Sequence, residues 1–159
     1  MSTKNKNQSG KTFIDNGIVV WEFDEKKVVE VPIDSIKLIA EYTTANGPIM
    51  DDWFLVIYNV KAEYFEISMY ADNIQEMMKE LGEKMEFELV STLFSSTEWE
   101  SNILYPTEFD GQDLWKIVKS EPKSTFEKLK SFIGINKTEI KLTEITKKII
   151  GKKPAYNNV

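Results

Sequence analysis

The side chains that could do chemistry in this chain are mostly carboxylates, and their tightest grouping follows a predicted turn. Asp51 and Asp52 are adjacent, and Glu41 lies near them on the preceding predicted strand if the two strands form a hairpin. Clustered carboxylates can hold Mg²⁺ or Ca²⁺, or can divide the roles of acid and base. Acidic residues at strand ends are also ordinary turn residues, and we favour that structural interpretation.

A second acidic motif, Asp110-Gly111-Gln112-Asp113, has the beginning of a calcium loop. It lacks the further acidic positions and the closing glutamate of an EF-hand, so a turn followed by a helix cap explains it better. We therefore expect neither a metal site nor a cofactor, and we assign no catalytic residue.

Three missing residue types exclude most common catalytic sites. The 159 residues include 20 lysines but no arginine, histidine or cysteine. Disulfides, thiolate zinc sites and histidine-activated nucleophiles are therefore excluded. The seven glycines never cluster into a phosphate-binding loop. An enzyme would have to work with Asp, Glu, Lys, Tyr or Ser alone, and we expect the protein not to be an enzyme.

Trp99 stands between two acidic residues, Glu98 and Glu100. An aromatic side chain ringed by charge is typical of an anchor at a protein interface, although tryptophan is equally common in cores. Together with the acidic cluster, these residues form the predicted partner-binding set: Glu41, Asp51, Asp52, Trp53, Glu98, Trp99 and Glu100.

Charge is distributed unevenly along the chain. Residues 12–113 carry 22 acids and six lysines, a net charge of −16, whereas residues 1–11 carry +3 and residues 114–159 carry +7, which sums to −6. A body this acidic repels nucleic acid and accelerates association with a basic protein. We expect a basic protein partner and no nucleic acid. The alternative, that the acids only solvate the surface, stays open.

The hydrophobic pattern predicts an α+β fold: mainly an antiparallel meander sheet of five to six strands, one short packed helix and C-terminal amphipathic helices. Strands are expected over 18–23, 28–31, 36–43, 52–60 and 63–70, followed by a helix over 74–81 that ends at Gly82 and a sixth strand over 84–91. Residues 92–113 are predicted to be irregular apart from a candidate strand near Ile103. Further helices are expected over 113–120, 122–133 and 138–150.

Four segments follow from this pattern. Residues 1–11 are predicted to be a disordered polar tail, 12–119 an acidic α+β domain, 120–150 a basic helical extension packed on it, and 151–159 a frayed tail. The longest apolar run, Trp53 to Tyr58, has six residues, against the roughly 20 that span a membrane. We expect a cytoplasmic protein without membrane contact. Edge strands and an amphipathic tail leave a homodimer open.

One stretch of the chain carries a resemblance. Val31-Pro32-Ile33, Glu41-Tyr42-Thr43-Thr44, Asn46-Gly47-Pro48 and Asp51-Asp52-Trp53 follow one another in a series that resembles small bacterial immunity proteins of interbacterial toxin systems. Tyr105-Pro106, Gly111 and Leu114 add to it. The resemblance implies an inhibitor that neutralises a basic toxin or nuclease through an acidic surface.

The pattern leaves one other fold and one other function open. The strand meander is similar to that of pleckstrin-homology-like barrels, but the helix expected at 73–81 lies between strands and departs from their scheme. The alternative function is an adaptor or scaffold domain of a bacterial or phage assembly, which would bind through an edge strand or the C-terminal helices.

Overall fold

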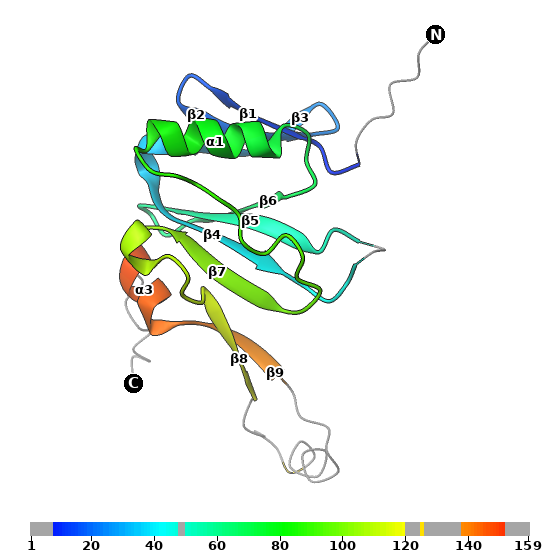
Figure 1. Cartoon of the computed structure of the whole chain (residues 1–159), viewed down its shortest axis with the longest axis vertical. Coiled ribbons are helices and arrows are strands. Elements are labelled where there is room, and N and C mark those ends of the chain that lie inside the picture. The colour runs from blue at the N-terminus through cyan, green and yellow to red at the C-terminus, as the bar shows by residue number, and fades with distance from the viewer. Residues whose placement is uncertain (1–7, 48–49, 120–124, 126–137, 152–159) are drawn as a thin grey trace.

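The computed structural model describes residues 8–47, 50–119, 125 and 138–151. Antiparallel strands dominate, and they form a three-stranded sheet, a four-stranded sheet and a two-stranded ribbon, joined by two helices (Figure 1). The α+β class is therefore confirmed. Neither described helix combines the length and the apolar character needed to cross a bilayer.

The first sheet pairs β1 (Lys11–Asp15), β2 (Ile18–Phe23) and β3 (Lys26–Pro32) in that order. Asp24 and Glu25 both have positive φ between β2 and β3, as a two-residue primed turn requires. The hydrophobic pattern does not predict β1, which begins inside the predicted polar tail. Ser9, just before it, is also buried, whereas residues 1–7 lie outside the described part.

The second sheet has the order β6-β5-β4-β7, with β4 (Ile36–Thr43) and β5 (Trp53–Asn59) at its centre. Its edges are β6 (Tyr64–Ser68) and β7 (Glu100–Tyr105). The predicted single meander over 18–70 is therefore wrong. After Pro32, the short 3-10 turn η1 (Ile33–Ser35) redirects the chain into a different sheet.

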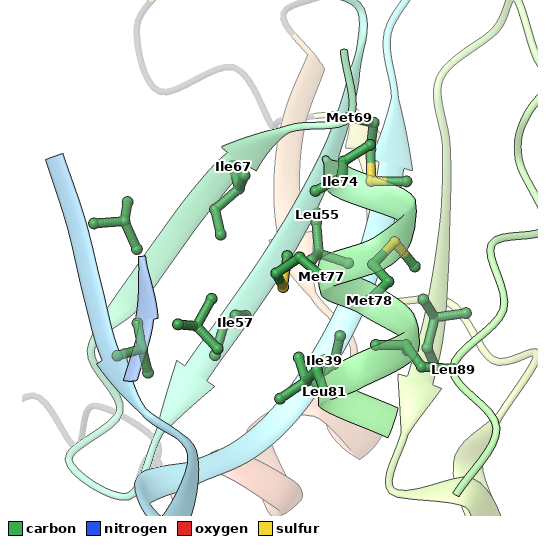
Figure 2. Close-up of a cluster of buried hydrophobic side chains, with 14 of the residues drawn as sticks. Ile39, Leu55, Ile57, Ile67, Met69, Ile74, Met77, Met78, Leu81 and Leu89 are labelled. Carbon is green, nitrogen blue, oxygen red and sulfur yellow. The ribbon is translucent and has the colours of Figure 1, made fainter. Parts of the chain in front are cut away.

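The two faces of the second sheet each cover a core. Helix α1 (Ile74–Lys84) and the first sheet cover one face, where Leu55, Ile57 and Ile67 of the sheet contact residues of α1 (Figure 2). Leu38, Ala40, Val56, Ile103 and Leu114 form the core on the opposite face, together with Ile150 of α3 (Glu144–Ile150). The side chains of β4 and β5 are accordingly buried almost throughout.

Helix α1 confirms the prediction over 74–81 but continues to Lys84. It buries four apolar residues at helical spacing, Ile74, Met77, Met78 and Leu81. Gly82 lies inside the helix instead of ending it. A Cβ atom there would stand 2.7 Å from the carbonyl oxygen of Phe87, so glycine permits the close approach of the following segment.

The strand predicted over 84–91 is not formed. Met85 and Phe87 donate their backbone N–H groups to carbonyls of Leu81 and Gly82, at the end of α1, and not to a neighbouring strand. The alternating side chains Met85, Phe87 and Leu89 still pack against the core beneath the helix. The alternation of apolar and polar residues over 84–91 therefore reflects burial of one side of the segment, and not a β-strand.

The C-terminal region also differs from the prediction. Residues 113–120 and 138–150 were expected to be helical, but β8 (Trp115–Lys119) and β9 (Thr138–Leu142) form an antiparallel ribbon. β-Branched residues favour this state, as in the directly paired Ile117 and Ile140. Helix α3 lies within the expected range 138–150 but covers only its second half. The helix expected over 122–133 lies outside the described residues apart from residue 125. The boundary predicted at residue 119 falls between two paired strands.

The 3-10 turn η2 (Thr107–Phe109) completes the described elements and leads from β7 towards β8. The candidate strand near Ile103 is confirmed as β7. The turn η2 separates β7 from β8 in the chain.

Candidate functional site

Glu41 is buried in the middle of the second sheet, where it accepts hydrogen bonds only from neutral donors. One oxygen accepts Trp53 Nε1–H and the Ser91 hydroxyl, both at 3.0 Å. The other accepts the Thr92 N–H at 2.6 Å, the Thr92 hydroxyl at 2.8 Å and the Leu93 N–H at 3.2 Å. Every partner acts as a donor, and the five bonds use the acceptor capacity of both carboxylate oxygens. Glu41 therefore fixes the 91–93 segment onto the sheet.

Two further hydrogen bonds tie this part of the chain to the sheet. The Thr43 hydroxyl donates to the carbonyl oxygen of Glu98 at 2.6 Å, and Asn102 Nδ2 donates to Thr92 Oγ1 at 2.6 Å. The irregular segment 91–98 is thus tied to β4 and β7 from several positions. The segment is followed directly by Trp99 and by Glu100, the first residue of β7.

A cleft of about 530 Å³ lies beside the outer edge of β7. One wall comes from the 92–93 segment and the first residues of β7, and the other comes from the 110–117 segment. Its lining residues are Thr92, Leu93, Trp99, Glu100, Ser101, Asn102, Asp110, Gly111, Asp113, Trp115, Lys116 and Ile117.

The cleft forms where the chain after η2 separates from β7. Gly111 donates its N–H to the Ile103 carbonyl at 3.1 Å, and Ile103 donates to the Gln112 carbonyl at 2.7 Å, so the turn covers this part of the edge. The positive φ of Gly111, 86°, is a conformation that glycine adopts without strain. Leu114 then bonds to the Ser101 hydroxyl at 3.0 Å, and β8 leaves in a new direction.

The charge of the cleft is negative. Glu100, Asp110 and Asp113 are all exposed, and Lys116 is the one basic side chain among the lining residues. Five ion pairs join described residues, and none of them uses these three carboxylates. Ser96 donates its hydroxyl to Glu100. The wall therefore presents acceptors that the described lysines do not neutralise by direct pairing.

Two tryptophans line the cleft, one from each wall. Trp99 is 42% exposed, which leaves much of its indole ring free to contact another molecule. Trp115 is half-buried and packs edge-on against Tyr42, with 4.4 Å between ring centroids. Trp115 is thereby anchored to the second sheet, whereas Trp99 is presented by the 91–98 segment.

Asn102 supplies an acceptor without a partner. The residue is 8% exposed, and Oδ1 is the one buried side-chain polar atom in the described part of the chain that makes no hydrogen bond. An unmade hydrogen bond at a buried amide oxygen costs about 1–3 kcal/mol. Such an atom at a cleft wall is a functional-site indicator.

The other predicted carboxylates lie at a different corner. Asp51 accepts the hydroxyls of Ser9 at 2.8 Å and Ser68 at 2.5 Å, while Asp52 accepts the Tyr70 hydroxyl at 2.5 Å. This hydrogen bond is the main cause that raises the pKa of Tyr70 to about 12. The strand register pairs Glu41 with Leu55, so the expected grouping of Glu41 with the two aspartates is not formed.

A tyrosine cluster occupies the α3 side of the second sheet. Glu66 accepts the hydroxyls of Tyr42, at 2.7 Å, and of Tyr64. Burial, followed by the hydrogen bond to Glu66, raises the pKa of both phenols well above its ordinary value. Burial also raises the pKa of Tyr58, whose ring packs on Tyr64. These phenols are structural groups that stay neutral over the physiological range.

The structure thus separates the seven predicted partner-binding residues into three places. Trp99 and Glu100 line the cleft, and the exposed Glu98 precedes them in the chain. Glu41 and Trp53 lie inside the protein, with 0% and 5% of their surface exposed, and cannot form a surface contact. The two aspartates accept hydrogen bonds from Ser9, Ser68 and Tyr70 at the other corner.

Sequence reasoning missed several residues of the cleft. Asp110 and Asp113 were interpreted as a turn and a helix cap; the turn is present, but the strand β8 follows in place of a helix. The two closely spaced aspartates were the feature of the sequence that could have indicated a site here. Asn102 and Trp115 carried none, because only the β4–β7 pairing and the departure of β8 bring them to one surface.

The carboxylates of the cleft do not converge on a point. Within residues 8–47, 50–119, 125 and 138–151, no group of three or more acidic residues is placed to hold a metal ion. Comparison of the chain with protein-family models, with curated proteins and with solved structures finds no match.

Proposed function

We propose that this protein is a non-enzymatic, immunity-type inhibitor that binds a basic toxin or nuclease through its acidic surface and blocks it. The observation that carries this proposal is the cleft beside β7. Its lining combines three exposed carboxylates, those of Glu100, Asp110 and Asp113, with the exposed Trp99. Tryptophan and charged groups in this arrangement are typical of a protein-binding anchor.

The charge of the whole body supports fast capture. The 22 acids and six lysines of residues 12–113 create a negative field that attracts a basic partner before contact. Steering of this kind acts mainly on the association rate and weakens as salt rises. The cleft then supplies the specific contact, because its acidic groups have no lysine partner among the described residues that would have to be displaced.

The second candidate is an adaptor that binds through an edge strand. One observation favours it: β6 pairs with β5 alone in the described sheet. Helix α3 is less suited to this role, because Thr146 and Ile150 are buried against the sheet. Deleting residues 120–159 would not separate the candidates cleanly, since it removes β9 and α3 from the fold. Point substitutions in the cleft separate the two candidates, because they leave these elements in place.

Affinity capture from the native host tests the proposal. The purified protein is used as bait at low and at high salt, and bound proteins are identified by mass spectrometry. We expect one basic protein at low salt, with association slowed about tenfold or more at high salt. Recovery of a partner that is neutral or whose association is insensitive to salt would contradict the immunity proposal and favour binding through β6.

A further inference from the structure

The amide of Asn102 is oriented by the network around Glu41. The Thr92 hydroxyl donates to Glu41 Oε1 at 2.8 Å, so the lone pairs of Thr92 Oγ1 remain to accept Asn102 Nδ2 at 2.6 Å. A flipped amide would place Oδ1 against an oxygen whose proton is already donated elsewhere. Oδ1 is therefore fixed as the unpartnered end of this side chain, and Asn102 is one of the residues that line the cleft.

From this arrangement we propose that the cleft accepts the ammonium group of a lysine side chain from the basic partner, with Asn102 Oδ1 as one of its hydrogen-bond acceptors. The inference rests on the proposed function and specifies the chemistry of its binding site. The ammonium carries three donors and no acceptor. The cleft offers a complementary surface: the unpartnered Oδ1 as a hydrogen-bond acceptor, and the exposed carboxylates of Glu100, Asp110 and Asp113 as a source of negative potential.

Size and geometry favour lysine over arginine. The acceptors come from two walls, and the described acids do not converge. An ammonium group can bond to a single acceptor such as Oδ1 without a second one beside it, whereas the planar guanidinium fork requires two coplanar oxygens. A volume of about 530 Å³ also leaves room for residues next to the lysine. Trp99 provides an aromatic surface that attracts a cation.

Binding must include a small adjustment of the cleft wall. Oδ1 has less than 1 Å² of exposed surface, so atoms that cover it have to move before an ammonium can reach it. Side-chain rearrangements of this size are common at protein interfaces. The gain is the hydrogen bond that the buried oxygen lacks in the free protein.

Nuclear magnetic resonance of the ¹⁵N-labelled full chain tests the inference directly. The probe is a tetralysine peptide, its control is the same peptide with every side chain acetylated, and a tetra-arginine peptide tests the preference. We expect tetralysine to shift the Asn102 side-chain amide and the Trp99 and Trp115 indole signals in a saturable way. The acetylated peptide should have no effect, and tetra-arginine should bind at least about threefold more weakly.

Two substitutions sharpen the result. Asn102→Leu removes the acceptor and should weaken tetralysine binding about tenfold, as loss of a hydrogen bond to a charged group does. Asp113→Asn should weaken it about threefold by charge alone, while the matched exposed control Asp34→Asn should not. If Asn102→Leu does not fold, the wild-type Asn102 signal and Asp113→Asn carry the test.

Three outcomes would overturn the inference: no binding of tetralysine, shifts confined to another surface, or an unmoved Asn102 amide. None of these would contradict the proposed function, which is tested by salt-dependent capture. Conversely, tetralysine binding in the cleft without a basic partner in the capture experiment would support the ammonium site and contradict the inhibitor.

Discussion

Glu41 and the carboxylates of the cleft are close in the fold but opposite in environment. Glu41 is fully buried, and its two oxygens accept five hydrogen bonds from the protein itself. Glu100, Asp110 and Asp113 are exposed, and no described lysine pairs with them. In the first environment, hydrogen bonds within the protein already occupy the carboxylate oxygens. The second leaves its acceptors available to another molecule.

This difference teaches how to interpret an acidic sequence. Net charge alone does not distinguish the two environments, because Glu41 and Glu100 contribute equally to it. What distinguishes them is the number of protein donors around each group.

The largest effect is expected for the two tryptophans. Trp53→Ala should lower the free energy of unfolding by about 4 kcal/mol, because it empties a buried site and removes a donor from Glu41. Trp99→Ala should cost less than about 1 kcal/mol, because that ring is 42% exposed. Urea denaturation measures both. Equal losses would contradict the assignment of Trp53 to the structure and Trp99 to the surface.

Glu41→Gln should lower the free energy of unfolding by about 3 kcal/mol, because the amide nitrogen would face donors that the second carboxylate oxygen now accepts. Glu76→Gln, an exposed residue of α1, is the matched control and should be near neutral. The same urea series applies. A near-neutral Glu41→Gln would show that the buried network is not what holds the 91–93 segment.

Stability should fall at alkaline pH. The pKa of Tyr70 is raised from 10.0 to about 12, so its contribution is complete below pH 10 and is lost as the pH rises towards 12. The raised pKa values of Tyr42 and Tyr64 act in the same direction. Tyrosinate absorbance and unfolding should be followed together. Tyr70→Phe should reduce the loss between pH 10 and 12, and an unchanged slope would contradict the role of its bond to Asp52.

The smallest stability effect is expected in the cleft itself. The triple variant Glu100→Gln, Asp110→Asn, Asp113→Asn should change the free energy of unfolding by less than about 0.5 kcal/mol, since exposed substitutions usually do. Thermal denaturation is sufficient to measure it. If the triple variant lost as much free energy of unfolding as Glu41→Gln, these carboxylates would also stabilise the fold. The contrast between Glu41 and the cleft carboxylates would then be wrong.

The sequence predicted those elements whose periodicity matches their burial. Helix α1 and strands β4, β5 and β6 were found because their apolar residues recur at the spacing of one buried face or fill both faces. The segment 84–91 has the same alternation but bonds its backbone to the end of α1. Strands β8 and β9 were missed because their pairing joins residues 115–119 to residues 138–142 across the sequence.

The candidate site was predicted only where neighbours in sequence remain neighbours on the surface. Glu98, Trp99 and Glu100 form such a group. The burial of Glu41 depends on Ser91, Thr92 and Leu93, about fifty residues away, and no local pattern reveals these donors. Tertiary contacts decided which acids build the fold.

Parallel capture with three baits tests the central claim most directly. Wild type, the cleft triple variant and a matched triple variant, Asp34→Asn, Glu76→Gln, Glu86→Gln, are exposed to the same host extract at low salt. Both variants change the net charge from −6 to −3 by replacing three exposed acids. We predict that the cleft variant loses the basic partner about tenfold or more, whereas the matched variant keeps most of it. Equal loss in both variants would contradict the claim that the cleft, and not the overall charge, selects the partner.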